Sequence, residues 1–177
     1  MTLTVHVSVQ DGRIPLSRAR VAEIATRVLR AEGARDAEIS ITFLSNRAIA
    51  ALNMAHLGHR GPTDVISFDF APAAPGAPIM GDVYIAPDVA RAHAQRFGVP
   101  VREELARLVV HGTLHVLGRT HPEGDARTRS PMWRRQEELL SRILGTPARA
   151  RGERSRTRAD RPSPRASGSD RSRGKGT

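Results

Sequence analysis

Hydrophobic residues either alternate with polar ones or recur at helical spacing along most of the first 145 residues. Alternation is typical of half-buried strands, and it predicts strands at residues 3–9, 37–45, 63–70 and 81–86. Spacing of three and four predicts helices at residues 16–33, 46–57, 86–98, 102–118 and 130–145. The order of these elements predicts an α+β domain, a small mixed four-stranded sheet packed with helices.

The helix at residues 102–118 is expected to be the central one, because its apolar stripe is long and continuous. The stripe consists of Leu105, Leu108, Val109, Gly112 and Val116. The same helix carries two histidines near its end, which makes it a zincin-like element within the predicted fold.

Length and composition narrow the class of protein. A chain of 177 residues fits one domain, expected at residues 1–146, followed by a tail at residues 147–177. No apolar run approaches the roughly 18 to 20 residues that cross a bilayer, and the first residues lack a basic start, so a cytoplasmic protein is expected. The absence of cysteine excludes disulfides and thiolate ligands, which leaves His, Asp and Glu for any metal site.

The net charge of +10 is concentrated in the tail. Residues 147–177 contain ten Arg or Lys against three Asp or Glu, a net of +7, and almost nothing apolar. The tail is therefore expected to be disordered. Two interpretations stay open: a solubilising extension, or a loose, salt-sensitive grip on nucleic acid phosphates.

The segment "HGTLHVLGRTH" at residues 111–121 contains three histidines at the spacing of a metal site. Residues four apart lie on one face of a helix, so His111 and His115 can bind one ion. Gly118 permits a left-handed turn that returns His121 toward them. Three imidazoles with an open fourth position are typical of catalytic zinc, although nickel and copper also accept imidazole. A lone histidine is usually an ordinary packing or surface residue, and that interpretation is kept for His6, His56 and His93.

The same spacing occurs in metzincin proteases, and Met132 lies downstream where a Met-turn could be. In those proteases the residue after the first histidine is a glutamate that takes the proton from the zinc-bound water. Here that residue is Gly112, and no other carboxylate of the motif replaces it. A metalloprotease therefore remains only a minor alternative.

With these residues in view, the chain resembles the YbeY family of bacterial rRNA maturation factors, regarded as metal-dependent single-strand endoribonucleases. The resemblance covers residues 50–140 and rests on "HGTLHVLGRTH", "LNMAHLGHRGPTDVISF", "GDVYIAPDVA" and "MWRRQEELL". It implies one zinc ion on His111, His115 and His121. It also implies a cytoplasmic enzyme that acts in 3′-end maturation of small-subunit (16S) rRNA and in late ribosome quality control.

Two positions within the matched region depart from the family pattern. Leu57 lies near the position where the family usually has an arginine, so His59 or Arg60, two and three residues on, is expected to supply the catalytic positive charge. Arg119 and Thr120 replace the usual Tyr-Asp before the third histidine, which removes a carboxylate that could support a ligand.

Zinc lowers the pKa of a bound water to about 7, so the metal-bound water could act without a glutamate, or the RNA 2′-hydroxyl could attack instead. The expected partners are single-stranded RNA, the small ribosomal subunit and its assembly factors, with no membrane and no DNA. Aromatic residues are few, and most of Phe68, Phe70, Tyr84 and Trp133 are expected to serve core packing. The alternative from a different class is a ribosome-assembly binding factor whose metal is mainly structural.

Overall fold

The computed structural model describes residues 1–10, 13–122 and 124–145. The predicted tail at residues 147–177 lies outside the described residues, so the boundary of the domain stays a prediction. In the described part of the chain, no helix is both long and apolar enough to span a membrane.

Four strands form one mixed sheet, which confirms the predicted α+β class. The strands are β1 (Leu3–Val9), β2 (Ala37–Phe43), β3 (Val65–Phe70) and β4 (Ile79–Ile85), in the spatial order β1-β2-β4-β3. The pairs β1/β2 and β2/β4 are parallel, whereas β3/β4 is antiparallel. β4 starts two residues earlier than the alternation predicted, because the Ile79 amide donates to the Asp36 carbonyl at 3.0 Å and extends the ladder.

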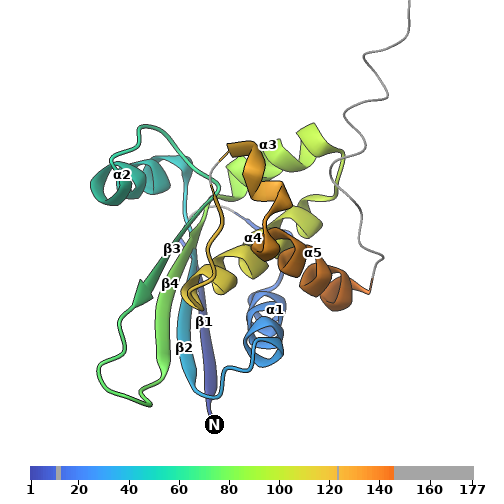
Figure 1. Ribbon diagram of the computed structural model, residues 1–177. Helices are drawn as coiled ribbons and strands as arrows, with labels where there is room; N and C mark the ends of the chain where they lie inside the picture. Colours follow the sequence, from blue (N-terminus) through green and yellow to red (C-terminus); the bar gives the residue numbers. More distant parts are fainter. Residues whose placement is uncertain (11–12, 123, 146–177) are drawn as a thin grey trace, which may run out of the picture.

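The α-helices of the described residues are α1 (Arg18–Ala31), α2 (Asn46–Leu57), α3 (Pro87–Phe97), α4 (Val101–Val116) and α5 (Pro131–Leu144). A short 3₁₀ segment, η1 (Gly124–Arg129), precedes α5 and was not predicted. Figure 1 shows α1, α4 and α5 on one face of the sheet, while α2 lies apart at the end where β2 and β4 terminate.

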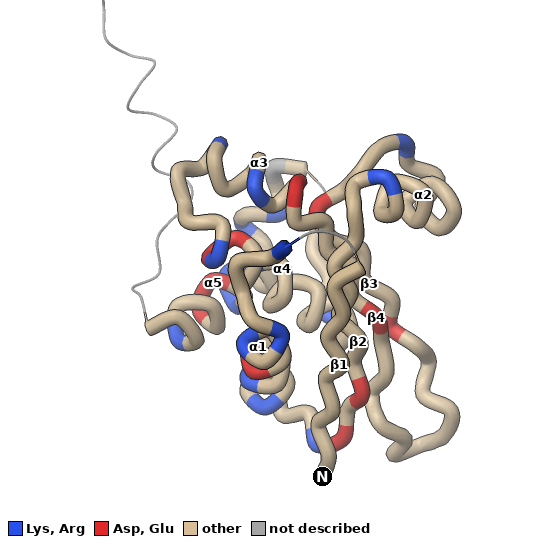
Figure 2. Tube along the Cα trace, turned by 180° about the vertical axis from the view of Figure 1, so that it is seen from behind, with Lys and Arg blue, Asp and Glu red and all other residues tan. Residues whose placement is uncertain are grey.

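The helices begin where the sequence supplies caps. Ser17, Ser45 and Ser130 each accept a backbone N–H two to three residues into α1, α2 and α5. Lys/Arg and Asp/Glu are mixed along α1 and α5 (Figure 2), so the outer faces of these helices are solvated while their apolar faces pack inward.

The main core lies between the sheet and helices α1, α4 and α5. α4 is central, as predicted, because it contacts α1, α3, α5, β3 and β4. Nearly every residue from Glu104 to Leu114 is buried. A second, smaller apolar cluster packs α2 against the sheet and includes Phe68 and Tyr84 as partly buried members, as expected. Phe70 departs from that expectation, since it is 49% exposed.

Candidate metal centre and the adjacent pocket

The last turns of α4 place His111 and His115 on one face of the helix. The helix then ends in a Schellman motif, in which the Arg119 amide donates to the Leu114 carbonyl at 3.0 Å and the Gly118 amide to the His115 carbonyl at 2.8 Å. Gly118 has the left-handed φ of 76° that this motif requires. The turn reverses the chain and brings His121 back to the helix, as the sequence predicted.

The three histidines point their Nε2 atoms at one another. The distances between these nitrogens are 3.0 Å (His111 to His115), 3.2 Å (His115 to His121) and 3.4 Å (His111 to His121). Nitrogens bound to zinc at 2.0 to 2.1 Å with tetrahedral angles would lie about 3.3 Å apart. The cluster therefore has the size that one metal ion needs, and these residues could hold it.

Carbonyl oxygens fix which nitrogen of two of the rings carries the proton. Nδ1 of His111 lies 2.6 Å from Oε1 of Gln136, and Nδ1 of His121 lies 2.9 Å from the Pro122 carbonyl. Because a carbonyl oxygen only accepts, each Nδ1 is the donor, and each Nε2 keeps a free lone pair. The amide of Gln136 is itself oriented, since its Nε2 donates to Glu137 at 3.0 Å.

The surroundings keep the two helical histidines neutral. Burial lowers the pKa of His111 to about 3, and the neighbouring charges of His115, Arg127 and His121 act in the same direction. Burial likewise lowers the pKa of His115 to about 4, assisted by His121 and Arg127. At neutral pH both rings are therefore unprotonated, the state in which imidazole binds a metal.

Gly112 faces the sheet, where a larger side chain would have little room. A Cβ at residue 112 would overlap Cγ1 of Val83 on β4 and would approach Oγ of Ser67 on β3 to 3.1 Å. A glutamate at this position would have no room unless α4 moved off the sheet. The absent base of the protease motif is thus a consequence of how closely α4 packs on β3 and β4.

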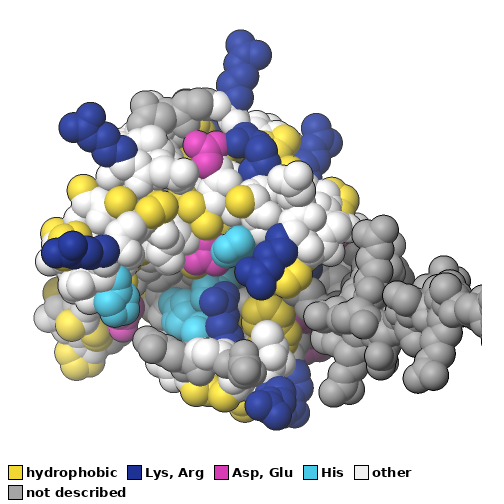
Figure 3. Space-filling model, turned by 90° about the horizontal axis from the view of Figure 1, so that it is seen from above, with side chains coloured by type: hydrophobic (Ala, Val, Ile, Leu, Met, Phe, Trp, Pro, Cys, Tyr) yellow, Lys and Arg dark blue, Asp and Glu magenta, His cyan; other side chains and the backbone are white. Residues whose placement is uncertain are grey.

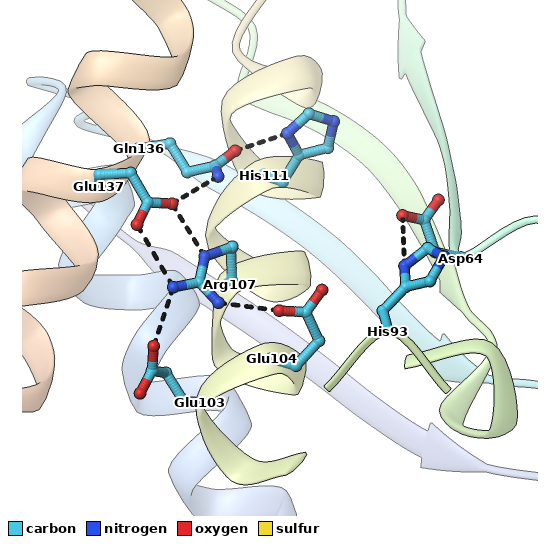
Figure 4. Close-up of polar contacts among 8 residues, drawn as sticks. All are labelled: Asp64, His93, Glu103, Glu104, Arg107, His111, Gln136 and Glu137. Atoms are coloured by element: carbon cyan, nitrogen blue, oxygen red, sulfur yellow. Dashed lines mark hydrogen bonds and ion pairs between the residues drawn. The ribbon is translucent and has the colours of Figure 1, made fainter. Parts of the chain in front are cut away.

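A buried ion network supports the metal centre from behind (Figure 4). Arg107 is 4% exposed and binds Glu103, Glu104 and Glu137 at 2.8 to 2.9 Å. Burial alone would lower the pKa of Arg107, but the hydrogen bonds and charges of these carboxylates raise it, so the guanidinium stays charged. Glu137 also accepts a hydrogen bond from the amide of Gln136, so the network extends from α4 through α5 to Nδ1 of His111.

A second ion cluster fixes the loop that carries His121. Glu32, at the end of α1, has a side chain only 4% exposed and binds Arg119 and Arg135, each at 2.7 Å. Burial raises the pKa of Glu32, but the hydrogen bonds of Arg135 and Arg119 outweigh this and lower it. Arg119 thus has a structural role at the position where the family pattern has tyrosine.

A pocket of about 670 Å³ lies beside the histidine cluster and shares His111 with it. Its lining residues come from the segment before β3, from α3, α4, η1 and α5: Asp64, His93, Arg96, Phe97, Glu104, Arg107, Leu108, His111, Arg127, Thr128, Arg129, Trp133 and Gln136. Figure 3 shows histidine side chains gathered in a hollow, with Lys and Arg side chains around it.

The structure separates the predicted site residues into two groups. His111, His115 and His121 meet at one point. His59 and Arg60 are exposed in the segment after α2, and neither lines the pocket. Their catalytic role stays a prediction.

Of the histidines treated as ordinary, His6 pairs with Glu38 on the sheet surface and His56 packs on Phe68. His93 differs, because it lies 3.7 Å from Asp64 in the wall of the pocket. Met132 is a buried core residue of α5 and forms no Met-turn.

Comparison with known proteins agrees with this geometry. The family model described as "Endoribonuclease YbeY" matches residues 6–144. The chain is 30% identical over 152 residues to an endoribonuclease YbeY of Syntrophus aciditrophicus, covering 83% of this chain and 94% of that protein. It is 36% identical over 150 residues to one of Pelotomaculum thermopropionicum, covering 80% and 97%.

A solution structure of a Thermotoga maritima protein has the same fold. Its TM-score is 0.55 at 22% identity, and the match covers 80% of this chain and 90% of that one. Together, the family match, the curated relatives and the histidine cluster at the end of α4 show that this chain belongs to the YbeY family.

Proposed function

We propose that this protein is a zinc-dependent endoribonuclease specific for single strands, acting in 3′-end maturation of 16S rRNA and in late ribosome quality control. The observation that carries the proposal is the convergence of three Nε2 atoms within 3.4 Å of one another, in a chain whose curated relatives are named endoribonucleases. The location proposed with this function is the cytoplasm.

His111, His115 and His121 would hold one zinc ion and leave its fourth position open to solvent or substrate. When bound, the ion supplies Lewis-acid chemistry at a water or phosphoryl oxygen. Gln136 and the Pro122 carbonyl hold two of the imidazole rings in the required tautomer and orientation. Because Gly112 packs on Val83, α4 has no room for a glutamate at the position where metzincin proteases have their base. This favours a reaction that needs no such base.

Cleavage of a phosphodiester builds negative charge on the phosphate, and a cation near the centre would stabilise it. His59 or Arg60 is proposed for this role through movement of their exposed loop. The double change His59→Ala and Arg60→Ala tests it by the rate of RNA cleavage at saturating substrate. A rate equal to the wild-type rate would remove both residues from the mechanism.

RNA is favoured as the partner by charge as well as by family. The chain has 28 Lys or Arg against 18 Asp or Glu, and this excess suits the phosphates of single-stranded RNA in the small subunit. Assembly factors of that subunit are proposed as further partners, and DNA is not expected.

Metal removal separates the enzyme from an assembly factor with a structural metal. The wild-type protein would be treated with a chelator and then compared with the zinc-loaded form by circular dichroism and by cleavage of an rRNA 3′-end fragment. The expected result is a stripped protein that stays folded and stops cutting, because the apolar residues of α4 belong to a core cluster that includes none of the three histidines. Unfolding on metal loss would instead favour the structural role.

A further inference from the structure

The pocket beside the histidines is a cleft between three helices rather than part of the metal centre alone. α4 forms its floor and contributes His111, whose Nε2 belongs to the metal cluster. α3 contributes His93 and Phe97 to its lining, and η1 and α5 contribute Arg127 and Trp133. A ligand in this cleft would therefore lie directly beside any group bound at the three histidines.

Two arginines that line this pocket, Arg107 and Arg127, differ in their hydrogen-bond partners. Arg107 is bound by three carboxylates and is 4% exposed, so its charge is neutralised within the fold. The Nε of Arg127 is buried without a hydrogen-bond partner among the side chains that the structure describes. A ligand that supplies an acceptor to this guanidinium would satisfy that donor.

Arg127 lies close to the metal centre. It lines the same pocket as His111, whose Nε2 belongs to the histidine cluster. Its guanidinium carbon is 5.7 Å from the centre of the Trp133 ring, a cation–π distance that holds the side chain at the wall of the pocket. An anion bound by Arg127 would thus be held next to the three Nε2 atoms.

Trp133 provides an aromatic surface in the same pocket. It is the single tryptophan of the chain, it is only partly buried, and it lines the pocket instead of the core. Phe97, 41% exposed, also lines the pocket. A volume of about 670 Å³ is within the roughly 300–1,000 Å³ of pockets that enclose small organic ligands, which includes a nucleotide.

We propose that this pocket binds one unpaired nucleotide of the RNA, with its base stacked on Trp133 and its phosphate bound by Arg127. Stacking on an aromatic ring together with a backbone cation is how proteins bind single strands without reading sequence. The adjoining phosphodiester would then lie at His111, His115 and His121. The inference rests on the proposed function, because it assigns a substrate subsite to the same centre.

The same assignment gives a reason for single-strand specificity. A base that is paired and stacked in a duplex cannot enter a pocket between α3 and α5 without first being unpaired and flipped out. Unpaired RNA avoids that cost.

The test uses the zinc-loaded full chain and a 5′-fluorescein hexanucleotide with 2′-O-methyl sugars, in which the 2′-oxygen cannot act as a nucleophile. Binding is followed by anisotropy of the fluorescein and, with unlabelled hexanucleotide, by the fluorescence of Trp133, which reports on the pocket alone because the chain has no other tryptophan. Cleavage of an unmodified hexanucleotide is measured in parallel. Zinc affinity and the unfolding midpoint are measured for each variant as checks of folding.

The expected result is quenching of Trp133 at saturation. Trp133→Leu should weaken binding at least about 5-fold, while Trp133→Phe, which keeps a ring, should bind nearly as the wild type does. Arg127→Gln should lower the slope of log affinity against log salt by about 0.7, the contribution of one phosphate contact on a single strand. The control Arg30→Gln, an exposed arginine of α1 outside the pocket, should leave the slope unchanged.

The subsite and the function fail in distinguishable ways. If the wild type cuts RNA but Trp133 is not quenched and the Trp133→Leu and Arg127→Gln variants bind normally, the subsite is wrong and the nuclease stands. Equal losses in Trp133→Leu and Trp133→Phe would also overturn the subsite, because packing rather than stacking would explain them. A wild type that neither binds nor cuts RNA refutes both.

Discussion

Replacing Gln136 by leucine removes the oxygen that accepts the Nδ1 proton of His111. His111 is 4% exposed and Gln136 is 1% exposed, so no water can substitute freely for the lost acceptor. The imidazole proton would then be free to move to Nε2, the nitrogen that the metal needs. Binding of the metal must reverse that shift, and this cost lowers the affinity.

The size of the expected loss in zinc affinity follows from the loss of this hydrogen bond. Loss of an outer partner of a metal-binding histidine typically costs 10- to 100-fold in affinity, which is about 1.4 to 2.7 kcal/mol. The metal-free Gln136→Leu protein should also lose stability, by about 1–3 kcal/mol, because the buried Nδ1–H of His111 has no other acceptor in its present position. Glu137 keeps Arg107 as a partner, so the loss should stay local.

Competition for zinc against a chromophoric chelator gives the affinity, and urea unfolding of the metal-free protein gives the stability. Gln136→Glu is the matched control. It keeps an oxygen that can accept from Nδ1 of His111, so it should bind zinc more tightly than Gln136→Leu does. If Gln136→Leu binds zinc with wild-type affinity, the account of how α5 orients His111 is refuted.

Two further predictions concern packing and pH. Gly112→Ala should destabilise the protein by about 1–3 kcal/mol through overlap with Val83, and Val83→Ala made with it should recover part of that loss in urea unfolding; strictly additive losses would contradict this contact. The pKa of Glu32 is lowered below its unfolded value of about 4.3 by Arg119 and Arg135, so its contribution is full above that pH and is lost as the pH falls further. The difference in unfolding midpoint between the wild type and Glu32→Gln should therefore be larger at pH 6 than at pH 3, and an equal difference at both would count against the ion cluster.

The sequence predicted those parts of the site that depend on local spacing. His111 and His115 are one helical turn apart, and Gly118 marks the turn that returns His121, so the cluster followed from eleven consecutive residues. The strands and helices were likewise visible from their periodicity. Each of these features is decided by residues near one another in the chain.

The parts that were missed depend on contacts between distant segments. Gln136 is 25 residues from His111, and nothing in the helical pattern of α5 distinguishes it from a surface glutamine. Most of the four aromatic residues were expected in the core, but Trp133 lines the pocket beside Arg127 of η1. From the sequence, Arg119 was only a departure from the family pattern. Its ion pair with Glu32, 87 residues earlier in the chain, depends on the fold. The sequence pattern predicted which residues lie on helices. It did not predict which side chains they contact, because that depends on how the helices pack on one another.

The proposed function requires that the three histidines form the catalytic centre of a ribonuclease. The most direct measurement compares the wild type with His115→Ala on an RNA fragment that carries the 3′ end of small-subunit rRNA, both loaded with zinc. His115 suits the test because it is less buried than His111, so its loss should disturb the core less than the loss of His111 would. The wild type should cut the fragment, and the folded variant should not. Equal cutting by both proteins would contradict the proposed function.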